Sequence, residues 1–403
     1  MKRLLIIASL AILAMSCEKT IVSNGVRTPI GFSTEVGKQT RAVVQNATYP
    51  TDQPFAVYAY GHQDAGSGDV VTPIMNNVEV SYTDAQTSAK WSATGTTKYY
   101  WPNDPRTTIN FYAYSPALVA NPTATANHQK LNGTIAHRET LDGNDQPGLY
   151  LTGYTHSNMY VDFMVARPVL DATYQDQDGT NGQAQNLSAV PTSFNHQMTQ
   201  VVFNVKTSED YSSGNITFTV TDITLNNIKD KANYSHTSLT PDYVDQNTSF
   251  TQGVWSAQEV TAGANDAKGT FNIFPAEKYV SGQVDNGAPG IGANEVAKEV
   301  TDQTVLATTP VTMIPQDLVA TVKDQQSGAV TTAGQSFTIT YTISGTGVAT
   351  ETVVKTVDLR SGNHTSWGVN QKVTYNVTIG LNEILFAPTV VGWEETSGGD
   401  IDI

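Results

Sequence analysis

The feature that most constrains the fold of this chain is a recurring alternation of apolar and polar residues in short segments. This alternation occurs at residues 30–36 and 78–82, further short strand-like runs lie at 54–60 and 109–114, and Gly, Asp, Asn or Pro residues lie between the segments. A period of two places one face of each segment in the core, as in a half-buried β-strand. No run long enough for several helical turns carries a helical period. The chain is therefore predicted to be all-β.

The second half of the sequence continues this pattern. One alternating run covers residues 193–205, and further strands are predicted at 216–225, 269–273, 311–314, 338–343, 352–359, 371–379 and 383–386. Residues 117–190 are less regular, with a candidate strand at 160–165 and a polar stretch at 171–188 that is predicted to be a linker. Short strands and turns at close spacing are typical of β-sandwiches. The sequence therefore predicts two β-sandwich domains in tandem, at residues 42–185 and 186–403.

Length and charge narrow the classes of function. The chain has 403 residues, with 22 Lys and Arg against 37 Asp and Glu, and its formal net charge is −15. Nucleic-acid binding requires clustered Lys and Arg, so a nucleic-acid partner is not expected. A single Cys excludes a disulfide within one chain.

The N-terminus has the order of an export signal. Met1-Lys2-Arg3 is basic, residues 4–14 are almost entirely apolar, and Ser16 and Cys17 follow. The apolar run is too short for a transmembrane helix, which needs about 20 residues. The segment resembles a bacterial lipobox, except that Ala14 stands where Leu is usual. Residues 1–16 are therefore predicted to be a lipoprotein signal peptide and Cys17 to be acylated, with an ordinary signal and an incidental Cys as the alternative.

The sequence shows no assembled catalytic or metal motif. It contains no G-x-S-x-G and no H-E-x-x-H, and its only Cys belongs to the signal. No cofactor and no metal are predicted. Carboxylate pairs cannot be judged from sequence, so an exported hydrolase stays open as a third hypothesis.

Three further features each have a functional and a structural interpretation. The loop at residues 176–182 has Asp and Asn at alternate positions near Gly179, which could suit calcium, but a plain turn is favoured. His196 is interpreted as a buried histidine rather than as a ligand or a base. Six aromatic residues could form a carbohydrate platform but are interpreted mainly as core; they are Tyr99, Tyr100, Trp101, Phe111, Tyr112 and Tyr114.

Several short motifs follow one another along nearly the whole chain. After Cys17 they are Ile30-Gly31-Phe32 with Thr40-Arg41-Ala42, Tyr99-Tyr100-Trp101-Pro102, Ile109-Asn110-Phe111-Tyr112-Ala113-Tyr114-Ser115-Pro116, Phe194-Asn195-His196-Gln197-Met198, Met313-Ile314-Pro315-Gln316, and the C-terminal segments from Trp367-Gly368 to Trp393. Each motif alone is weak. Their order and spacing resemble the fimbrillin family of Bacteroidales, which comprises the subunits of type V pili and related surface lipoproteins.

The resemblance implies two tandem transthyretin-like, Greek-key β-sandwich domains and no enzymatic activity. It also implies export as a lipoprotein, display on the outer membrane and in a fimbrium, and cell adhesion. An Arg-specific protease would cut between Arg41 and Ala42 and release the pro-segment at residues 17–41. Arg27 is a second, less favoured site, and an uncut Arg41 in an exposed loop is the alternative.

The implied partners are other fimbrial subunits, joined by donor-strand exchange, and the outer membrane through lipid before processing. A host or bacterial surface glycan or protein is a further candidate partner. The strand that processing removes carries Ile30, Phe32, Thr34 and Val36 on one face. Its seven residues would leave a groove about 23 Å long at ~3.3 Å per residue. An unpaired sheet edge accepts another strand, so donor-strand insertion would satisfy the exposed backbone.

The residues after Trp393 decide between a stalk and a tip subunit. Only Ile401 and Ile403 could fill pockets, and Gly398-Gly399 weakens a strand. We therefore expect a tip or accessory subunit that accepts a strand without supplying one. The alternatives are a surface lipoprotein that binds glycan or host protein without polymerising, and a fimbrial anchor.

Overall fold

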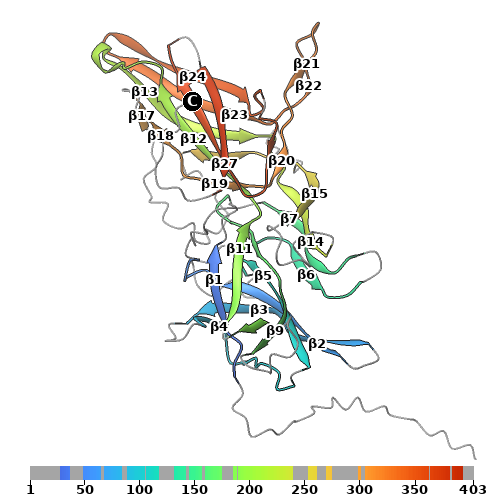
Figure 1. The fold of residues 1–403 in the computed structure, drawn as a ribbon. Coiled ribbons are helices and arrows are strands. Elements are labelled where there is room, and N and C mark those ends of the chain that lie inside the picture. Colours follow the sequence, from blue (N-terminus) through green and yellow to red (C-terminus); the bar gives the residue numbers. More distant parts are fainter. Residues whose placement is uncertain are drawn as a thin grey trace, which may run out of the picture.

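The structure is a computed structural model, and it describes residues 28–36, 49–64, 68–83, 89–104, 106–117, 131–141, 145–156, 159–174, 185–187, 189–238, 253–260, 269–274, 298–300, 305–362, 364–381 and 384–393. In this part of the chain nearly every element is a β-strand, and the short 3-10 turn η1 (Ser212–Gly214) is its one helical element. The all-β prediction is confirmed. The molecule is elongated, with the N-terminal strands at one end and most C-terminal strands at the other (Figure 1).

The lower unit in Figure 1 is built on a nine-stranded sheet that closes on itself. Its strands follow the order β10 (Gln185–Leu187), β9 (Val169–Tyr174), β5 (Thr107–Ser115), β2 (Phe55–Asp64), β3 (Asp69–Tyr82), β4 (Trp91–Ala93), β1 (Phe32–Val36), β11 (Val190–His196) and β8 (Met164–Ala166). A further pairing joins β5 to β8, at Tyr114 with Val165 and at Ser115 with Met164. The seven strands from β5 through β1 to β8 therefore form a closed ring.

Strands β2 and β5 bury side chains on both of their faces. Phe55 and Val57 of β2 belong to the core inside the ring, whereas Tyr58 belongs to a second cluster on the outer face. In β5, Phe111 lies in the inner core and Tyr112 in the outer cluster. Because both faces are covered, residues 109–114 form an almost continuous apolar run instead of a strict alternation.

The aromatic residues considered as a carbohydrate platform are mostly part of these cores. The buried ones are Trp101, Phe111, Tyr112 and Tyr114. Tyr99 is partly buried against the inner core, and Tyr100 is 39% exposed. The core interpretation is confirmed for the four buried rings.

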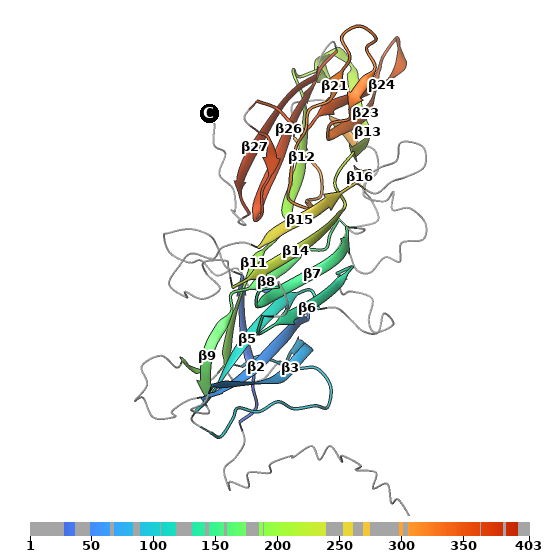
Figure 2. The same cartoon turned by 90° about the vertical axis from the view of Figure 1, so that its right-hand side faces the viewer.

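A four-stranded sheet covers the outer cluster and lies between the two ends of the molecule (Figure 2). Its order is β15 (Val254–Glu259), β14 (Lys231–Thr237), β7 (Gly148–Thr155) and β6 (Thr134–Arg138). Leu151 of β7 and Tyr234 of β14 are directly paired and share a core with Tyr58 and Tyr112. The sheet thus combines strands from both halves of the sequence. The domain boundary between residues 185 and 186 stays a prediction, and the pairing of β7 with β14 crosses it.

The upper unit is a β-sandwich. One sheet has the order β18 (Leu306–Ala307), β12 (Thr199–Thr207), β26 (Gln371–Ile379) and β27 (Ile384–Gly392), with β19 (Val311–Met313) also beside β12. The other has the order β16 (Phe271–Phe274), β13 (Ile216–Asn226), β23 (Ser336–Gly345) and β24 (Val348–Asp358), with β17 (Lys298–Val300) also beside β13. The rings of Phe203 and Phe337, one from each sheet, lie 4.9 Å apart in one shared core.

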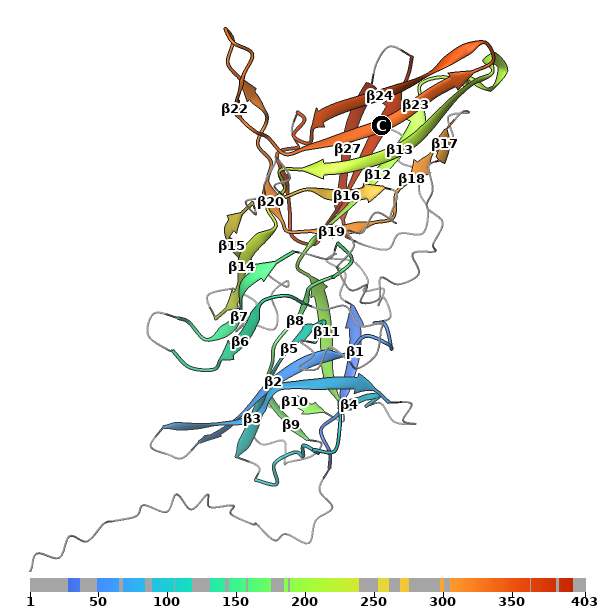
Figure 3. The same ribbon diagram turned by 180° about the vertical axis from the view of Figure 1, so that it is seen from behind.

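Two small two-stranded pairs complete the described strands. β20 (Gln316–Asp317) pairs with β25 (Ser366–Trp367) near the middle of the molecule. β21 (Val322–Lys323) pairs with β22 (Val330–Thr332), and this hairpin projects from the upper unit (Figure 3).

The chain passes from the lower to the upper unit at Gln197 and Met198. The prediction of a single strand at 193–205 is wrong, because β11 ends in the lower ring and β12 begins in the upper sandwich. The fully buried Gln197 explains the break. Its side-chain oxygen accepts hydrogen bonds from the Tyr234 hydroxyl at 3.0 Å and from the Gly253 N–H at 3.3 Å. Its backbone carbonyl accepts the indole N–H of Trp255 at 2.7 Å.

Candidate functional site

Strand β1 is the member of the ring that links β4 to β11. All five of its residues pair in parallel with β11, from Phe32 opposite Val190 to Val36 opposite Phe194. On its other side it makes one antiparallel pair, between Phe32 and Trp91 of β4. The ring therefore depends on β1, and removal of this strand would leave β11 with one unpaired edge.

The residues just before β1 are held by backbone hydrogen bonds. The Ile30 N–H donates to the Tyr99 carbonyl at 2.9 Å, and the Trp101 N–H donates to the Thr28 carbonyl at 3.1 Å. The strand itself begins at Phe32, two residues later than predicted, because Ile30 pairs with this neighbouring segment and not with β11. Both Ile30 and Phe32 are nevertheless buried, at 3% and 1% exposure.

Phe32 fills an aromatic box inside the ring. Its ring packs edge-on against Phe55 at 5.9 Å and against Phe111 at 5.8 Å between centroids. Trp91 and Phe194 belong to the same buried cluster. Edge-to-face geometry at this separation is a favourable arrangement of aromatic rings, and it adds to the burial of a large apolar surface.

The four predicted groove residues are not equally buried. Ile30 and Phe32 are fully inside, whereas Thr34 and Val36 are half-buried. Val36 still packs against the inner core, and Glu35 on the other face accepts a hydrogen bond from the Ser193 hydroxyl at 2.8 Å. The structure thus places Phe32, Thr34 and Val36 on β1 and Ile30 just before it, and the burial is concentrated at Ile30 and Phe32.

The residues that β1 packs against could not be identified from the sequence. Gly31 and Ala89 are in close approach, and a Cβ atom built at Gly31 would lie 2.5 Å from the Ala89 Cβ. The Gly31 carbonyl also accepts the Val190 N–H at 2.9 Å. The signal in the sequence was the glycine between two large apolar residues, since glycine in a strand often marks a close approach.

Several predicted sites lie outside the described residues. These are Cys17, Arg27, Arg41, Ala42 and the candidate calcium loop at residues 176–182. The predicted linker at 171–188 includes the end of β9 and the whole of β10, and the part between these two strands is also outside the described residues. Elsewhere, no three His, Cys, Asp or Glu side chains of the described residues come together as a metal site. No described helix is long and apolar enough to span a membrane.

His196 lies at the junction of the two units and is only partly buried. Its Nδ1 is 2.7 Å from the Asp162 carboxylate, and its ring stacks on Trp393 with centroids 4.0 Å apart and planes 7° apart. Trp393 follows β27 and donates its backbone N–H to the Asn370 carbonyl. This histidine therefore fastens the end of β27 to the lower unit. It was interpreted as a buried histidine, and the structure shows it hydrogen-bonded to Asp162 but only partly buried.

A cluster of charged and polar side chains joins β2, β3 and the residue after β6. His62 lies between two carboxylates, with Nε2 2.6 Å from Glu139 and Nδ1 2.5 Å from Asp69. The side-chain amide of Asn110 donates to the same Glu139 oxygen at 2.7 Å. The hydrogen bond to Glu139 raises the pKa of His62 to about 9, with Asp69 adding to the effect and burial opposing it.

The pKa of His62 predicts a pH dependence of stability. The unfolded value is about 6.5, so the histidine adds stability that is fully present below pH 6.5 and is lost as the pH rises through about 9. In wild-type protein we expect the urea midpoint to fall over this window. His62→Gln should show a flatter profile there, and an unchanged slope in the variant would contradict the assignment.

Two other histidines give the opposite dependence. Burial lowers the pKa of His156 to about 4 and that of His137 to about 3. They contribute stability above pH 6.5 that is lost as the pH falls through these values. His62→Gln should not change the loss of stability at acid pH. That loss is therefore an internal control for the loss at alkaline pH.

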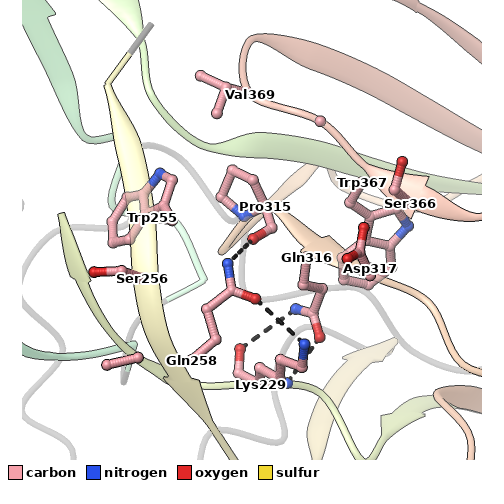
Figure 4. A pocket seen from close by; sticks show the side chains of 12 residues that line it. Lys229, Trp255, Ser256, Gln258, Pro315, Gln316, Asp317, Ser366, Trp367 and Val369 are labelled. Carbon is pink, nitrogen blue, oxygen red and sulfur yellow. Dashed lines mark hydrogen bonds between the residues drawn. The ribbon is translucent and has the colours of Figure 1, made fainter. Parts of the chain in front are cut away.

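A second candidate site is a groove of about 580 Å³ between the middle sheet and the upper unit (Figure 4). Trp255 and Trp367 lie on opposite sides of it, with Gln258, Gln316 and Lys229 along its floor. The side-chain amide of Gln258 donates to the Pro315 backbone carbonyl at 2.6 Å, and the side-chain Oε1 of Gln316 accepts the Lys229 backbone N–H at 2.9 Å. Trp255 and Trp367 are both buried, at 9% and 2% exposure, and their indole N–H groups donate to the Gln197 carbonyl and the Tyr375 hydroxyl.

Comparison with known proteins bears on the function of the chain. A profile of the fimbrillin-like family matches residues 40–393. A search of curated proteins found no match. Among solved structures, a fimbrial protein from Bacteroides vulgatus is 21% identical, with 91% of this chain and 99% of that chain covered and a TM-score of 0.46.

Two other solved structures align over similar lengths. A candidate cell adhesion protein from Bacteroides uniformis is 15% identical, with 91% of this chain and 99% of that chain covered and a TM-score of 0.40. The tip fimbrial protein Mfa3 from Porphyromonas gingivalis is 12% identical, with 85% and 95% covered and a TM-score of 0.27. The family profile, which spans most of the chain, is the stronger observation, and it supports a role as a cell-surface fimbrial subunit. This chain belongs to the fimbrillin-like family.

Proposed function

We propose that this protein is a tip or accessory subunit of a cell-surface fimbria, and that it is joined to another subunit by strand exchange. The observation that carries the proposal is the position of β1. This strand closes the ring between β4 and β11 and places Phe32 in the aromatic box. A strand from another subunit could occupy the same place once β1 has left, and it would satisfy the open edge of β11.

Cleavage between Arg41 and Ala42 would separate β1 from the rest of the chain. The strand ends at Val36, five residues before Arg41 in the sequence. After the cut, only noncovalent contacts would hold β1 in the ring. Export through the signal at residues 1–16 and acylation of Cys17 would place the uncut subunit on the outer membrane by lipid. The proposed role is structural and adhesive, not enzymatic.

The division into residues 42–185 and 186–403, each with a transthyretin-like sandwich, is part of the same proposal. The upper sandwich and the closed lower ring support two structural units. The middle sheet takes β6 and β7 from one half of the sequence and β14 and β15 from the other. The proposed halves are therefore interlocked rather than joined by a free linker.

The maturation step is tested by N-terminal sequencing of subunits in fimbriae sheared from the cell surface. We expect the sequence to begin at Ala42, because the cut frees β1 for replacement. An Arg41→Ala variant should instead keep Cys17 as its first residue and stay with the membrane fraction. If every wild-type copy in sheared fimbriae begins at Cys17, the processing step is wrong.

A second function has one observation in its favour. The groove between Trp255 and Trp367 could receive a glycan, as on a surface lipoprotein that does not polymerise or on a fimbrial anchor. In that case all surface copies would retain the lipid on Cys17 and would be found as single subunits. The same sequencing experiment therefore separates the two functions.

A further inference from the structure

The groove that β1 occupies carries a chemical requirement on any strand that replaces it; this inference rests on the proposed strand exchange. The requirement is concentrated at residues 30–32, because the residues that follow are half-buried. Each of these three positions meets a different wall of the groove. Together they describe the kind of strand that fits.

The middle position has no room for a side chain. A Cβ atom at Gly31 would lie 2.5 Å from the Ala89 Cβ and 3.4 Å from the Trp91 carbonyl oxygen. Real Cβ atoms do not approach so closely, and the Ala89 Cβ cannot rotate away as the end of a long side chain could. The backbone at Gly31 is also fixed, because its carbonyl accepts the Val190 N–H at 2.9 Å. A strand with a larger residue here would have to push the segment before β4 outward.

The next position selects an aromatic ring. Phe55 and Phe111 contact the ring of Phe32 edge-on from two sides, with interplanar angles of 87° and 88°. A smaller side chain would leave a cavity lined by these rings, and such cavities are costly. The position before the glycine also lies in the core, since Ile30 is 3% exposed.

The pairing fixes the direction of the strand. β1 runs parallel to β11 through five successive residue pairs and is antiparallel to β4 at Phe32. In the reversed direction, the aromatic side chain could not reach its box while the glycine faced Ala89. The order apolar, glycine, aromatic is therefore read in one direction only.

We propose that the groove selects an incoming strand with the order apolar–glycine–aromatic, which lies parallel to β11 with its glycine against Ala89 and its aromatic ring in the box of Phe55 and Phe111. The partner is thus another subunit whose donor segment carries this triplet. Residues after the aromatic position can vary more widely, because Ser33 and Thr34 are only half-buried.

The test uses the full chain with a site for a sequence-specific protease in place of residues 38–42. The protein folds first and is then cut, so that its own β1 stays seated. Exchange is measured with a fluorescent peptide of residues 28–38, in competition with unlabelled variants of that peptide. Ser33→Ala is the matched control, because Ser33 is only half-buried and follows directly on the two test positions.

We expect Phe32→Ala to weaken competition by about 100-fold or more, from the cost of deleting a buried ring. Gly31→Ala should weaken it by about tenfold through overpacking. Ser33→Ala should stay within about threefold of wild type, as a half-exposed position should. A peptide with the reversed sequence should not compete.

A substitution in the groove supplies the sharpest check. In cut protein that carries Ala89→Gly, the Gly31→Ala peptide should recover most of its lost affinity, because the clashing Cβ is gone. The Phe32→Ala peptide should recover nothing. This difference is a coupling between two positions in contact, which general weakening of the groove would not produce.

The outcomes separate the inference from the proposed function. If the wild-type peptide exchanges and all three variants compete equally well, strand exchange stands and the selection rule is wrong. If Ala89→Gly does not rescue Gly31→Ala, the steric reason for the glycine is wrong. If the wild-type peptide never enters the cut protein, both the rule and the proposed strand exchange are contradicted.

Discussion

Replacing Phe32 by Ala is expected to lower the free energy of unfolding of the uncut protein by about 3–5 kcal/mol. Phe32 is 1% exposed and contacts Phe55 and Phe111 edge-on. Truncation would remove this buried surface and leave a cavity in the middle of the ring. The box is lined by rings on several strands, so it cannot collapse without moving the sheet.

The measurement is equilibrium urea unfolding followed by tryptophan fluorescence, since Trp91 and Trp101 lie in the same core. Ser33→Ala is the control, because its side chain is half-exposed and lies next to Phe32 in the sequence. We expect the control to shift the urea midpoint only slightly. A Phe32→Ala protein as stable as the control would show that β1 is not part of the core.

Cutting the chain after Arg41 is expected to make β1 exchangeable and to expose the edge of β11. In the uncut protein, β1 is tied covalently beside its partners and pairs with β11 along its whole length. After the cut, dissociation of β1 is opposed only by noncovalent contacts. Amide hydrogen exchange in residues 190–194 should therefore become faster in the cut protein than in the uncut one.

Exchange in strands of the upper sandwich provides the control for this prediction. β12 and β26 pair with each other over nine residues and share no hydrogen bond with β1. Their amides should exchange at the same rate before and after the cut. Equal rates in residues 190–194 before and after the cut would mean that β1 stays in place and the ring does not open.

Much of the strand content could be predicted from the sequence. The segment at 371–379 alternates strictly, the segment at 216–225 alternates on either side of an irregularity between Val220 and Asp222, and the structure has β26 and β13 there. Local alternation is sufficient in these cases because one face of each strand meets a single core. The closing strand β1 was also predicted to place Ile30, Phe32, Thr34 and Val36 on one face.

The middle sheet could not be predicted. β6 is short, and β7 carries Gly153 with a positive φ of 63°, so neither shows a long alternation. The pairing of β7 with β14 joins residues about 80 positions apart in the sequence, between Leu151 and Tyr234. Such pairing depends on tertiary packing against Tyr58 and Tyr112 rather than on any local pattern.

The prediction of one strand at 193–205, where the chain crosses between the units, failed for a related reason. Residues 193–205 alternate well enough to suggest one strand, but Gln197 uses its side chain and its carbonyl to hold Tyr234, Gly253 and Trp255. These partners lie far along the chain, so no residue near Gln197 in the sequence indicates that the strand ends there. The requirement at Gly31 was hidden in the same way, because it depends on Ala89.

The most direct test of the account is native mass spectrometry of the cut protein incubated with an isotope-labelled peptide of residues 28–38. The account predicts replacement in a one-to-one ratio, in which the protein loses its own N-terminal fragment and gains one labelled peptide. The uncut protein should gain none. A cut protein that keeps its fragment and gains no peptide, or that gains the peptide without losing the fragment, would contradict the claim that β1 is an exchangeable strand of the ring.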